Sequence, residues 1–188
     1  MIVNQWRKEL ASLLMAKSYL EKDVILTSGK RSNYYFDCKQ TALHPDGAFF
    51  IGNLFVQMLR DTPLQGVAGM TLGADPLVTA TSLIARAEGL SWPAMIVRKE
   101  SKGHGTDSYL EGLANFQPGD RVAVLEDVAT TGGSALKACQ RLQSAGFVVA
   151  QVCCILDREE GATDALAAEN LPFTALFTRS QLLHEAGI

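Results

Sequence analysis

The sequence predicts an α/β fold with a mostly parallel five-stranded sheet flanked by helices. Apolar segments of strand length recur along the chain, and candidate helices separate them. These strands read as nearly continuous apolar runs, which is typical of a parallel sheet covered on both faces. The chain has 188 residues, of which 47% are hydrophobic and 20% charged, and this composition fits one globular domain over residues 1–188.

The N-terminal part is expected to contain a helix, a hairpin and a second helix. Apolar residues recur at helical spacing over residues 6–14. Residues 24–43 combine turn-forming residues with an aromatic run at 34–36, which indicates a hairpin. Asp46 is a suitable N-cap for a following helix that reaches Leu59 with an apolar stripe.

From residue 66 onward, strands alternate with helices. The expected strands cover residues 66–70, 94–97, 121–127, 148–156 and 173–177. The expected helices cover residues 75–86, with Asp75 as cap and Pro76 in the first turn, then 134–145, 162–169 and a short last helix capped by Ser180. Ligands of such sheets bind beyond the carboxyl ends of the strands, so chemistry is expected in the loops after these strands.

Charge and cysteine content exclude several classes of protein. The 17 basic and 20 acidic residues give a net charge of −3, which argues against a surface built for nucleic acid or anionic lipid. No apolar run approaches the roughly 18 residues of a membrane span, and the N-terminus does not read as a signal peptide. The four cysteines form no CxxC pair, so we expect reduced, buried thiols and a cytoplasmic protein.

The most informative stretch is RVAVLEDVATTGGSALKACQRL, residues 121–142. An apolar strand runs into Glu126 and Asp127 and then into residues 130–134 at the start of a helix. The glycines allow close approach of a phosphate, and free N–H groups and hydroxyls donate to it. The paired carboxylates can accept hydrogen bonds from ribose hydroxyls, so the stretch fits a ribose 5-phosphate. The alternative is a tight turn capped by Ser134 after a solvated strand end.

This stretch resembles the phosphoribosyl pyrophosphate (PRPP) loop of the type I phosphoribosyltransferases. The resemblance implies their fold, with a small N-terminal hood over residues 1–45 that contributes to the base site. It implies a catalytic role for Asp127. The loop residues that it implies for PRPP binding are Glu126, Asp127, Val128, Ala129, Thr130, Thr131, Gly132, Gly133 and Ser134.

A second segment, RKESKGHG at residues 98–105, is rich in basic groups. A solvated loop is one interpretation. A basic loop that closes over an anionic substrate would also exclude water and match the charge of a leaving pyrophosphate. The segment resembles the RKExKxHG loop of orotate phosphoribosyltransferases, which implies a homodimer with active sites shared across the interface. The residues implied for PRPP binding are Arg98, Lys99, Lys102 and His104, the last two also as catalytic residues.

Residues 27–39, TSGKRSNYYFDCK, resemble the SGRKSxYFF segment of the same family. The resemblance implies contacts from Tyr35 and Phe36 to the orotate ring, with Lys30 and Arg31 nearby. Thr27 stands where relatives often have a lysine. Without the resemblance, this aromatic run would be interpreted as a packed strand.

The strand at residues 148–156 leads into Asp157 and Arg158. A guanidinium at a strand end can pair bidentately with a planar carboxylate such as that of orotate, and a salt bridge to a neighbouring acid is the alternative. With the resemblance, Arg158 and Thr130 become the orotate contacts. The loop at residues 71–77 corresponds to the loop that binds pyrophosphate through backbone amides in this family. The resemblance therefore implies pyrophosphate contacts for Gly73, Ala74 and Asp75.

By resemblance, the expected reaction transfers ribose 5-phosphate from PRPP to orotate, giving orotidine 5′-monophosphate and pyrophosphate in UMP biosynthesis. The cofactor implied is Mg²⁺, held mainly by the pyrophosphate and ribose oxygens and not by protein ligands. One alternative is a purine or uracil phosphoribosyltransferase. Another is a non-catalytic nucleotide-sensing regulator, which usually needs a nucleic-acid-binding surface.

Overall fold

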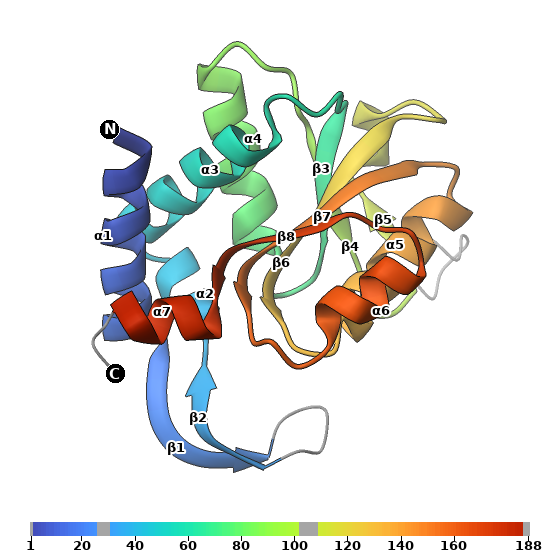
Figure 1. The fold of residues 1–188 in the computed structure, drawn as a ribbon. Helices are drawn as coiled ribbons and strands as arrows, with labels where there is room; N and C mark the ends of the chain where they lie inside the picture. Colours follow the sequence, from blue (N-terminus) through green and yellow to red (C-terminus); the bar gives the residue numbers. More distant parts are fainter. Residues whose placement is uncertain (1, 26–30, 102–108, 186–188) are drawn as a thin grey trace.

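The computed structural model describes residues 2–25, 31–101 and 109–185. A six-stranded sheet in the order β5-β4-β3-β6-β7-β8 forms its centre (Figure 1). The strands are β3 (Gly66–Met70), β4 (Ala94–Val97), β5 (Leu110–Glu111), β6 (Arg121–Ala129), β7 (Val148–Asp157) and β8 (Phe173–Thr178). All neighbouring pairs are parallel except β4–β5, so the carboxyl ends of the five parallel strands lie at one edge.

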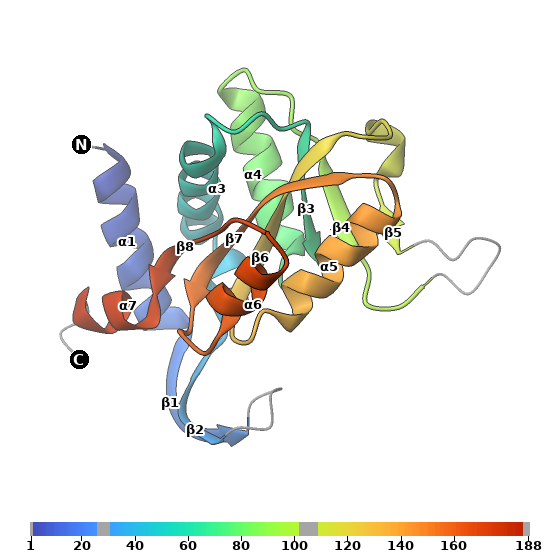
Figure 2. The ribbon, with the colours of Figure 1, turned by 45° about the vertical axis from the view of Figure 1, so that its right-hand side comes forward.

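Helices cover both faces of this sheet (Figure 2). The helices are α1 (Ile2–Lys17), α2 (Cys38–Ala42), α3 (Pro45–Leu59), α4 (Asp75–Ala87), α5 (Gly133–Ser144), α6 (Ala162–Ala168) and α7 (Arg179–Glu185), with a 3-10 turn at Leu113–Asn115. Side chains of β6 alternate between two hydrophobic cores. Leu125 packs in the core that α1, α3 and α4 share, whereas Val124 packs in the core with α5 and α6.

The cysteines belong to the apolar interior, as the sequence predicts. All four are buried free thiols. Cys153 and Cys154 alternate along β7 and lie in different clusters. Burial raises the pKa of Cys139 and Cys153 to about 12, so both thiols stay protonated at neutral pH.

A separate two-stranded antiparallel sheet projects from one end of the molecule (Figure 1). It consists of β1 (Tyr19–Ile25) and β2 (Arg31–Phe36), which pair from Tyr19 with Phe36 onward. This is the predicted hairpin, but its first strand begins at Tyr19, before residue 24. The last part of the predicted range, residues 24–43, forms α2 instead. Helix α2 follows directly after β2, and Tyr35 and Phe36 at the end of β2 line a cavity together with residues of the main sheet.

The prediction of five strands misses β5, a two-residue strand antiparallel to β4 at the edge of the sheet. A segment this short has no periodicity that the sequence could reveal.

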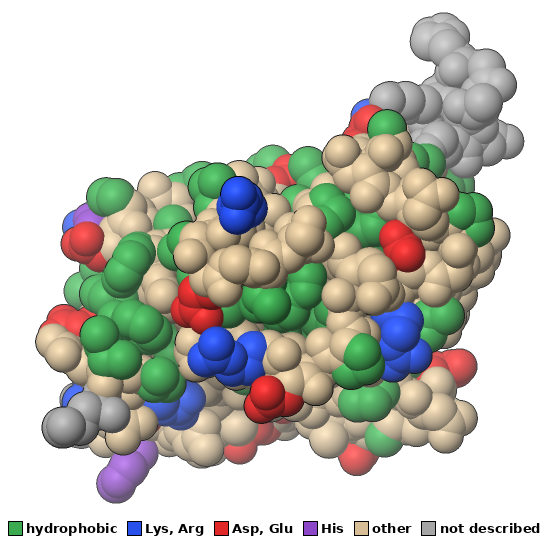
Figure 3. Space-filling model, turned by 90° about the horizontal axis from the view of Figure 1, so that it is seen from above, with side chains coloured by type: hydrophobic (Ala, Val, Ile, Leu, Met, Phe, Trp, Pro, Cys, Tyr) green, Lys and Arg blue, Asp and Glu red, His purple; other side chains and the backbone are tan. Residues whose placement is uncertain are grey.

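In the face seen in Figure 3, basic and acidic side chains are scattered among apolar ones. Within the described ranges, none of the helices combines the length and the apolar character needed to cross a membrane.

The capping predictions are wrong at three helices. His44 is the N-cap of α3, and its Nδ1 accepts from the N–H of Asp46 at 3.3 Å, because Pro45 fixes the first helical position one residue earlier. Ala74 precedes α4, and the carboxylate of Asp75 instead accepts from Thr71 Oγ1 at 2.9 Å. Helix α7 begins at Arg179, so Ser180 lies within its first turn.

Candidate active site

A cavity of about 730 Å³ opens at the carboxyl ends of the parallel strands, where the hairpin approaches the sheet. Its lining comes from Tyr35 and Phe36 of β2, Lys39 of α2, residues 70–73, Lys99, residues 126–135 and Arg158. The predicted site residues at 126–134 therefore meet Lys99, Arg158 and the paired aromatics around one space. Residues 70–73, Lys99, residues 126–135 and Arg158 meet in this site because parallel strands all end at the same edge, and the hairpin and α2 add their residues from outside that sheet.

Three other predicted site residues, Arg98, Ala74 and Asp75, lie outside the lining of this cavity. The guanidinium of Arg98 contacts Glu111 at 3.1 Å and the carbonyl of Glu100 at 3.3 Å, and does not line the cavity. Ala74 and Asp75 also lie outside the lining, whereas Gly73 belongs to it. Arg31 opens strand β2. Lys30, Lys102 and His104 lie outside the described residues.

The loop between β6 and α5 is shaped to present backbone N–H groups. Gly132 is the N-cap of α5, with φ of +80°, a left-handed conformation that favours glycine. Ser134 is the second residue of the helix, so the alternative in which it caps α5 is wrong. Because glycine has no side chain to accept from the first turn, the N–H groups at this helix start remain available to an anion.

Glu126 is a buried acid facing the cavity. It is 6% exposed, and its Oε2 is buried without a hydrogen-bond partner among the residues described. Burial, reinforced by the charge of Asp127, raises the pKa of Glu126 well above its ordinary 4.5. Leaving such an oxygen unpaired costs about 1–3 kcal/mol, so a hydroxyl donor in the cavity would be bound favourably.

Asp127 is held between its own backbone and the loop after β3. Its Oδ1 accepts from the N–H of Val128 at 2.9 Å. A Cβ on Gly73 would lie 2.5 Å from Cγ and from Oδ2 of Asp127. The loop can therefore approach this carboxylate only because residue 73 is a glycine, and the contact orients Asp127 toward the same cavity.

Lys39 is a cavity residue that the sequence analysis did not single out. Its Nζ lies 2.6 Å from Oδ1 of Asp37. Burial lowers the pKa of Lys39, but the hydrogen bond and charge of Asp37, with a further contribution from Asp127, outweigh burial and raise it. Lys39 therefore brings a positive charge to the cavity. The available sequence signal was its place directly after the aromatic run, in YYFDCK.

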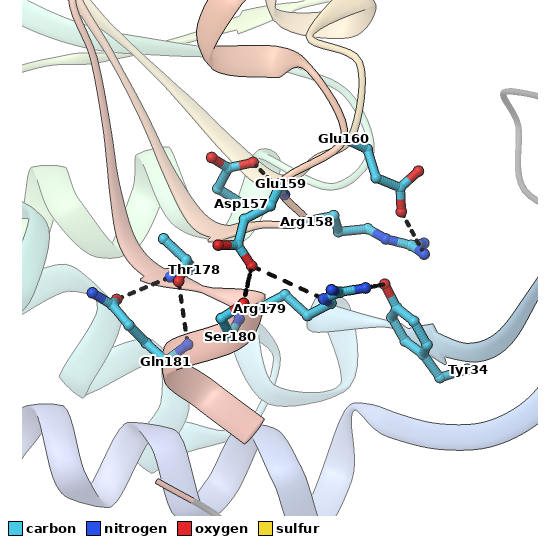
Figure 4. Close-up of polar contacts among 9 residues, drawn as sticks. All are labelled: Tyr34, Asp157, Arg158, Glu159, Glu160, Thr178, Arg179, Ser180 and Gln181. Carbon is cyan, nitrogen blue, oxygen red and sulfur yellow. Dashed lines mark hydrogen bonds and ion pairs between the residues drawn. The ribbon is translucent and has the colours of Figure 1, made fainter. Parts of the chain in front are cut away.

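Arg158 projects from the end of β7 beside the hairpin (Figure 4). Its side chain is 4% exposed, and Nη2 lies 2.9 Å from Oε1 of Glu160. The guanidinium also lies 4.7 Å from the ring centroid of Tyr34. The salt bridge that the sequence left open as an alternative is thus present, and it coexists with a position in the cavity wall.

Helix α7 is hydrogen-bonded to strand β2 and to the loop after β7. Nη1 of Arg179 donates to the hydroxyl of Tyr34 at 3.3 Å (Figure 4). Oε2 of Glu159 accepts from the N–H and the Oγ of Ser180 at 2.9 and 2.6 Å. The loop that carries Arg158 is therefore fixed to α7, and α7 is fixed to strand β2.

Comparison with known proteins identifies the family. No protein-family model matches the chain. An orotate phosphoribosyltransferase of Nostoc sp. is 48% identical over 94% of this chain and 84% of its own length. Another, from Thermosynechococcus vestitus, is 49% identical over 94% of this chain and 92% of its own.

A solved structure gives the same result for the fold. Orotate phosphoribosyltransferase of Mycobacterium tuberculosis in complex with PRPP matches with a TM-score of 0.77 and 35% identity, over 94% of this chain and 98% of that one. The type I phosphoribosyltransferase fold expected from the sequence is confirmed, with six strands in place of five. From its sequence relatives and its fold alike, the chain belongs to the orotate phosphoribosyltransferase family.

Proposed function

We propose that this protein transfers ribose 5-phosphate from PRPP to orotate, giving orotidine 5′-monophosphate and pyrophosphate in UMP biosynthesis. The observation that carries the proposal is one cavity lined by an anion-binding helix start, an acidic pair and an arginine. These three groups correspond to the 5-phosphate, the ribose and the carboxylate of the base. Formation of orotidine 5′-monophosphate together with pyrophosphate, in equal amounts, is the direct test.

The phosphate and ribose assignments follow from the loop after β6. Residues 130–134 would bind the 5-phosphate through backbone N–H groups and hydroxyls. Glu126 and Asp127 would accept hydrogen bonds from the ribose hydroxyls, which supplies the donor that Oε2 of Glu126 lacks among the described residues. Val128 and Ala129 line the same cavity and would contact PRPP beside the acidic pair.

The base would lie between the loop and the hairpin. Arg158 would pair with the carboxylate of orotate, with Thr130 beside it. Tyr35 and Phe36 would contact the ring from β2, since both line the cavity. The Glu160 carboxylate already on Arg158 means that the substrate carboxylate would share this guanidinium or displace Glu160 from it.

In the reaction, the bond between C1′ and the pyrophosphate oxygen breaks and pyrophosphate leaves with the electron pair. A ring nitrogen of orotate forms the new bond to C1′ and loses its proton, which passes to the leaving pyrophosphate or to solvent. Positive charge develops on the ribose as the old bond breaks, and the carboxylate of Asp127 would stabilise it. Lys99, with Lys102 and His104 outside the described residues, would stabilise the negative charge on the leaving group.

Mg²⁺ is the proposed cofactor. Within the described residues, no group of three or more His, Cys, Asp or Glu side chains could hold a metal ion, so the pyrophosphate and ribose oxygens would provide most ligands. When bound, the ion would offset the charge of the pyrophosphate. Chelation with EDTA should abolish turnover, and added Mg²⁺ should restore it; full activity after chelation would contradict the assignment.

We also propose a homodimer with shared sites, in which residues 1–188 form a single cytoplasmic domain and residues 1–45 contribute to the base site. If Lys102 acts in the partner's site, mixed dimers of Lys102→Ala and Arg158→Ala subunits contain one intact site. Mixing the two inactive variants should then recover activity. Verified mixed dimers that stay inactive would contradict shared sites.

A further inference from the structure

Arg141, on helix α5, contacts both sides of the connection between β4 and β5. Its Nη1 donates to the carbonyl of Arg98, and its Nη2 donates to the carbonyl of Lys99 at 2.9 Å. Its guanidinium carbon lies 4.0 Å from the centroid of the Tyr109 ring. One side chain therefore links residues 98 and 99, after β4, to residue 109, before β5.

The two backbone segments that Arg141 contacts are also paired with each other. Val97 pairs with Leu110 in the antiparallel β4–β5 ladder, and the N–H of Arg98 donates to the carbonyl of Tyr109 at 2.7 Å. Arg141 lies at the last backbone pair of this ladder. The two Nη donors of Arg141 bond to the carbonyls of Arg98 and Lys99, and its guanidinium lies over the ring of Tyr109.

Arg141 belongs to the helix that begins at the proposed phosphate loop. Helix α5 starts at Gly133, so Arg141 lies about 12 Å further along the axis of the same helix. Lys99, whose carbonyl accepts from Arg141, lines the same cavity as that loop. Helix α5 therefore connects two parts of the cavity lining, the loop after β6 and Lys99.

We propose that Arg141 is a positioning residue that holds Lys99 in place for the pyrophosphate of PRPP, relative to the loop that binds the 5-phosphate. The inference rests on the proposed function and extends it to a residue outside the cavity. Correct placement of a binding group contributes to affinity as well as to rate, so a link of this kind affects PRPP binding without touching the substrate.

The test compares Arg141→Ala with Arg141→Lys and with Lys137→Ala, a change at an exposed lysine on the same helix. Arg141→Ala should raise the KM for PRPP about tenfold, the effect of weakening one charged contact, and leave the KM for orotate nearly unchanged. Arg141→Lys should recover only part of the loss, because lysine keeps a donor but loses the fork and the planar stack. Lys137→Ala should behave as wild type.

A double-mutant cycle with Lys99→Ala separates positioning from a general structural role. If Arg141 acts through Lys99, Arg141→Ala should add little to the defect of Lys99→Ala, whereas independent effects would multiply. Multiplying effects, or an unchanged KM for PRPP in folded Arg141→Ala, would overturn the inference. If Arg141→Ala melts early, Arg141→Lys is assayed instead, and wild-type kinetics in that variant would also overturn it.

The wild-type enzyme distinguishes the two levels of the proposal. An inactive wild type with orotate and PRPP contradicts the proposed function itself. An active wild type with an unaffected Arg141→Ala contradicts only the role of Arg141. Calorimetric titration with PRPP provides a second readout that does not depend on turnover, and Arg141→Ala should bind PRPP more weakly than wild type.

Discussion

Nη2 of Arg158 lies 2.9 Å from Oε1 of Glu160, two residues further along the same loop. The arginine assigned to the substrate carboxylate thus already has a carboxylate partner within the chain. Its side chain is almost fully buried, and an uncompensated charge there would be costly. Glu160 offsets that cost and at the same time competes for the guanidinium.

Replacing Arg158 with lysine should raise the KM for orotate by roughly tenfold or more, because a hydrogen bond to a charged group contributes about 1.5–3 kcal/mol and lysine cannot form the bidentate pair. The KM for PRPP should change little. Steady-state kinetics with each substrate varied in turn measures both values. Arg86→Lys, at an exposed position on α4, is the matched control. An unchanged orotate KM would remove Arg158 from the base site.

Glu160→Gln should lower the KM for orotate a few-fold. Glutamine keeps an oxygen that can accept from Arg158 but no longer neutralises it, so the pocket becomes more attractive to an incoming carboxylate. The same kinetic assay measures this effect, with PRPP saturating. A higher orotate KM would show that Glu160 serves to orient Arg158 and not to compete for it.

Gly73→Ala should lower turnover about tenfold while the fold persists. The new methyl group would lie 2.5 Å from the carboxylate of Asp127 and push it from the position that Val128 supports. Comparison of kcat with the melting temperature separates the two effects. Wild-type kcat in a folded Gly73→Ala variant would show that the orientation of Asp127 is unimportant for the reaction.

Glu126 should make stability depend on pH. Its pKa is raised in the folded state above the ordinary 4.5, so the folded protein binds this proton more tightly than the unfolded chain does. The resulting stability is fully present below pH 4.5 and is lost as pH rises through the raised pKa.

Glu126→Gln, which cannot ionise, should therefore lose less stability than wild type between about pH 5 and about pH 8. Urea denaturation at both pH values gives the free energies of unfolding. Glu169→Gln, at an exposed position, is the control and should follow wild type. A difference between Glu126→Gln and wild type that is the same at both pH values would contradict the assigned cause.

The sequence predicts the parts of the site that local patterns encode. The strand, the acids and the glycine-rich helix start at residues 121–134 are contiguous, and together with the expected parallel sheet their order favours a phosphate site over a simple turn. The topology of a parallel sheet then brings Arg158 to the same edge. These predictions depend on short segments and on a general rule about strand ends, and the structure places those residues around one cavity.

Other features of the structure could not be predicted from the sequence because they depend on tertiary contacts. Arg141 reads as one more polar residue on an amphipathic helix, and its partners at residues 98 and 99 lie more than 40 positions away. Lys39 likewise lines the cavity because α2 packs against β6 of the main sheet, which the sequence around Lys39 does not reveal. Strand β5 is defined by its pairing with β4 and not by its own two residues.

The central claim is that orotate is the base that accepts the ribose. The most direct measurement is the loss of orotate absorbance on mixing the purified protein with PRPP and Mg²⁺, with parallel reactions containing uracil, adenine or hypoxanthine. The account predicts that orotate disappears with an equal amount of pyrophosphate released, and that the other bases are left unchanged. Turnover of a purine or of uracil, with orotate unchanged, would contradict it.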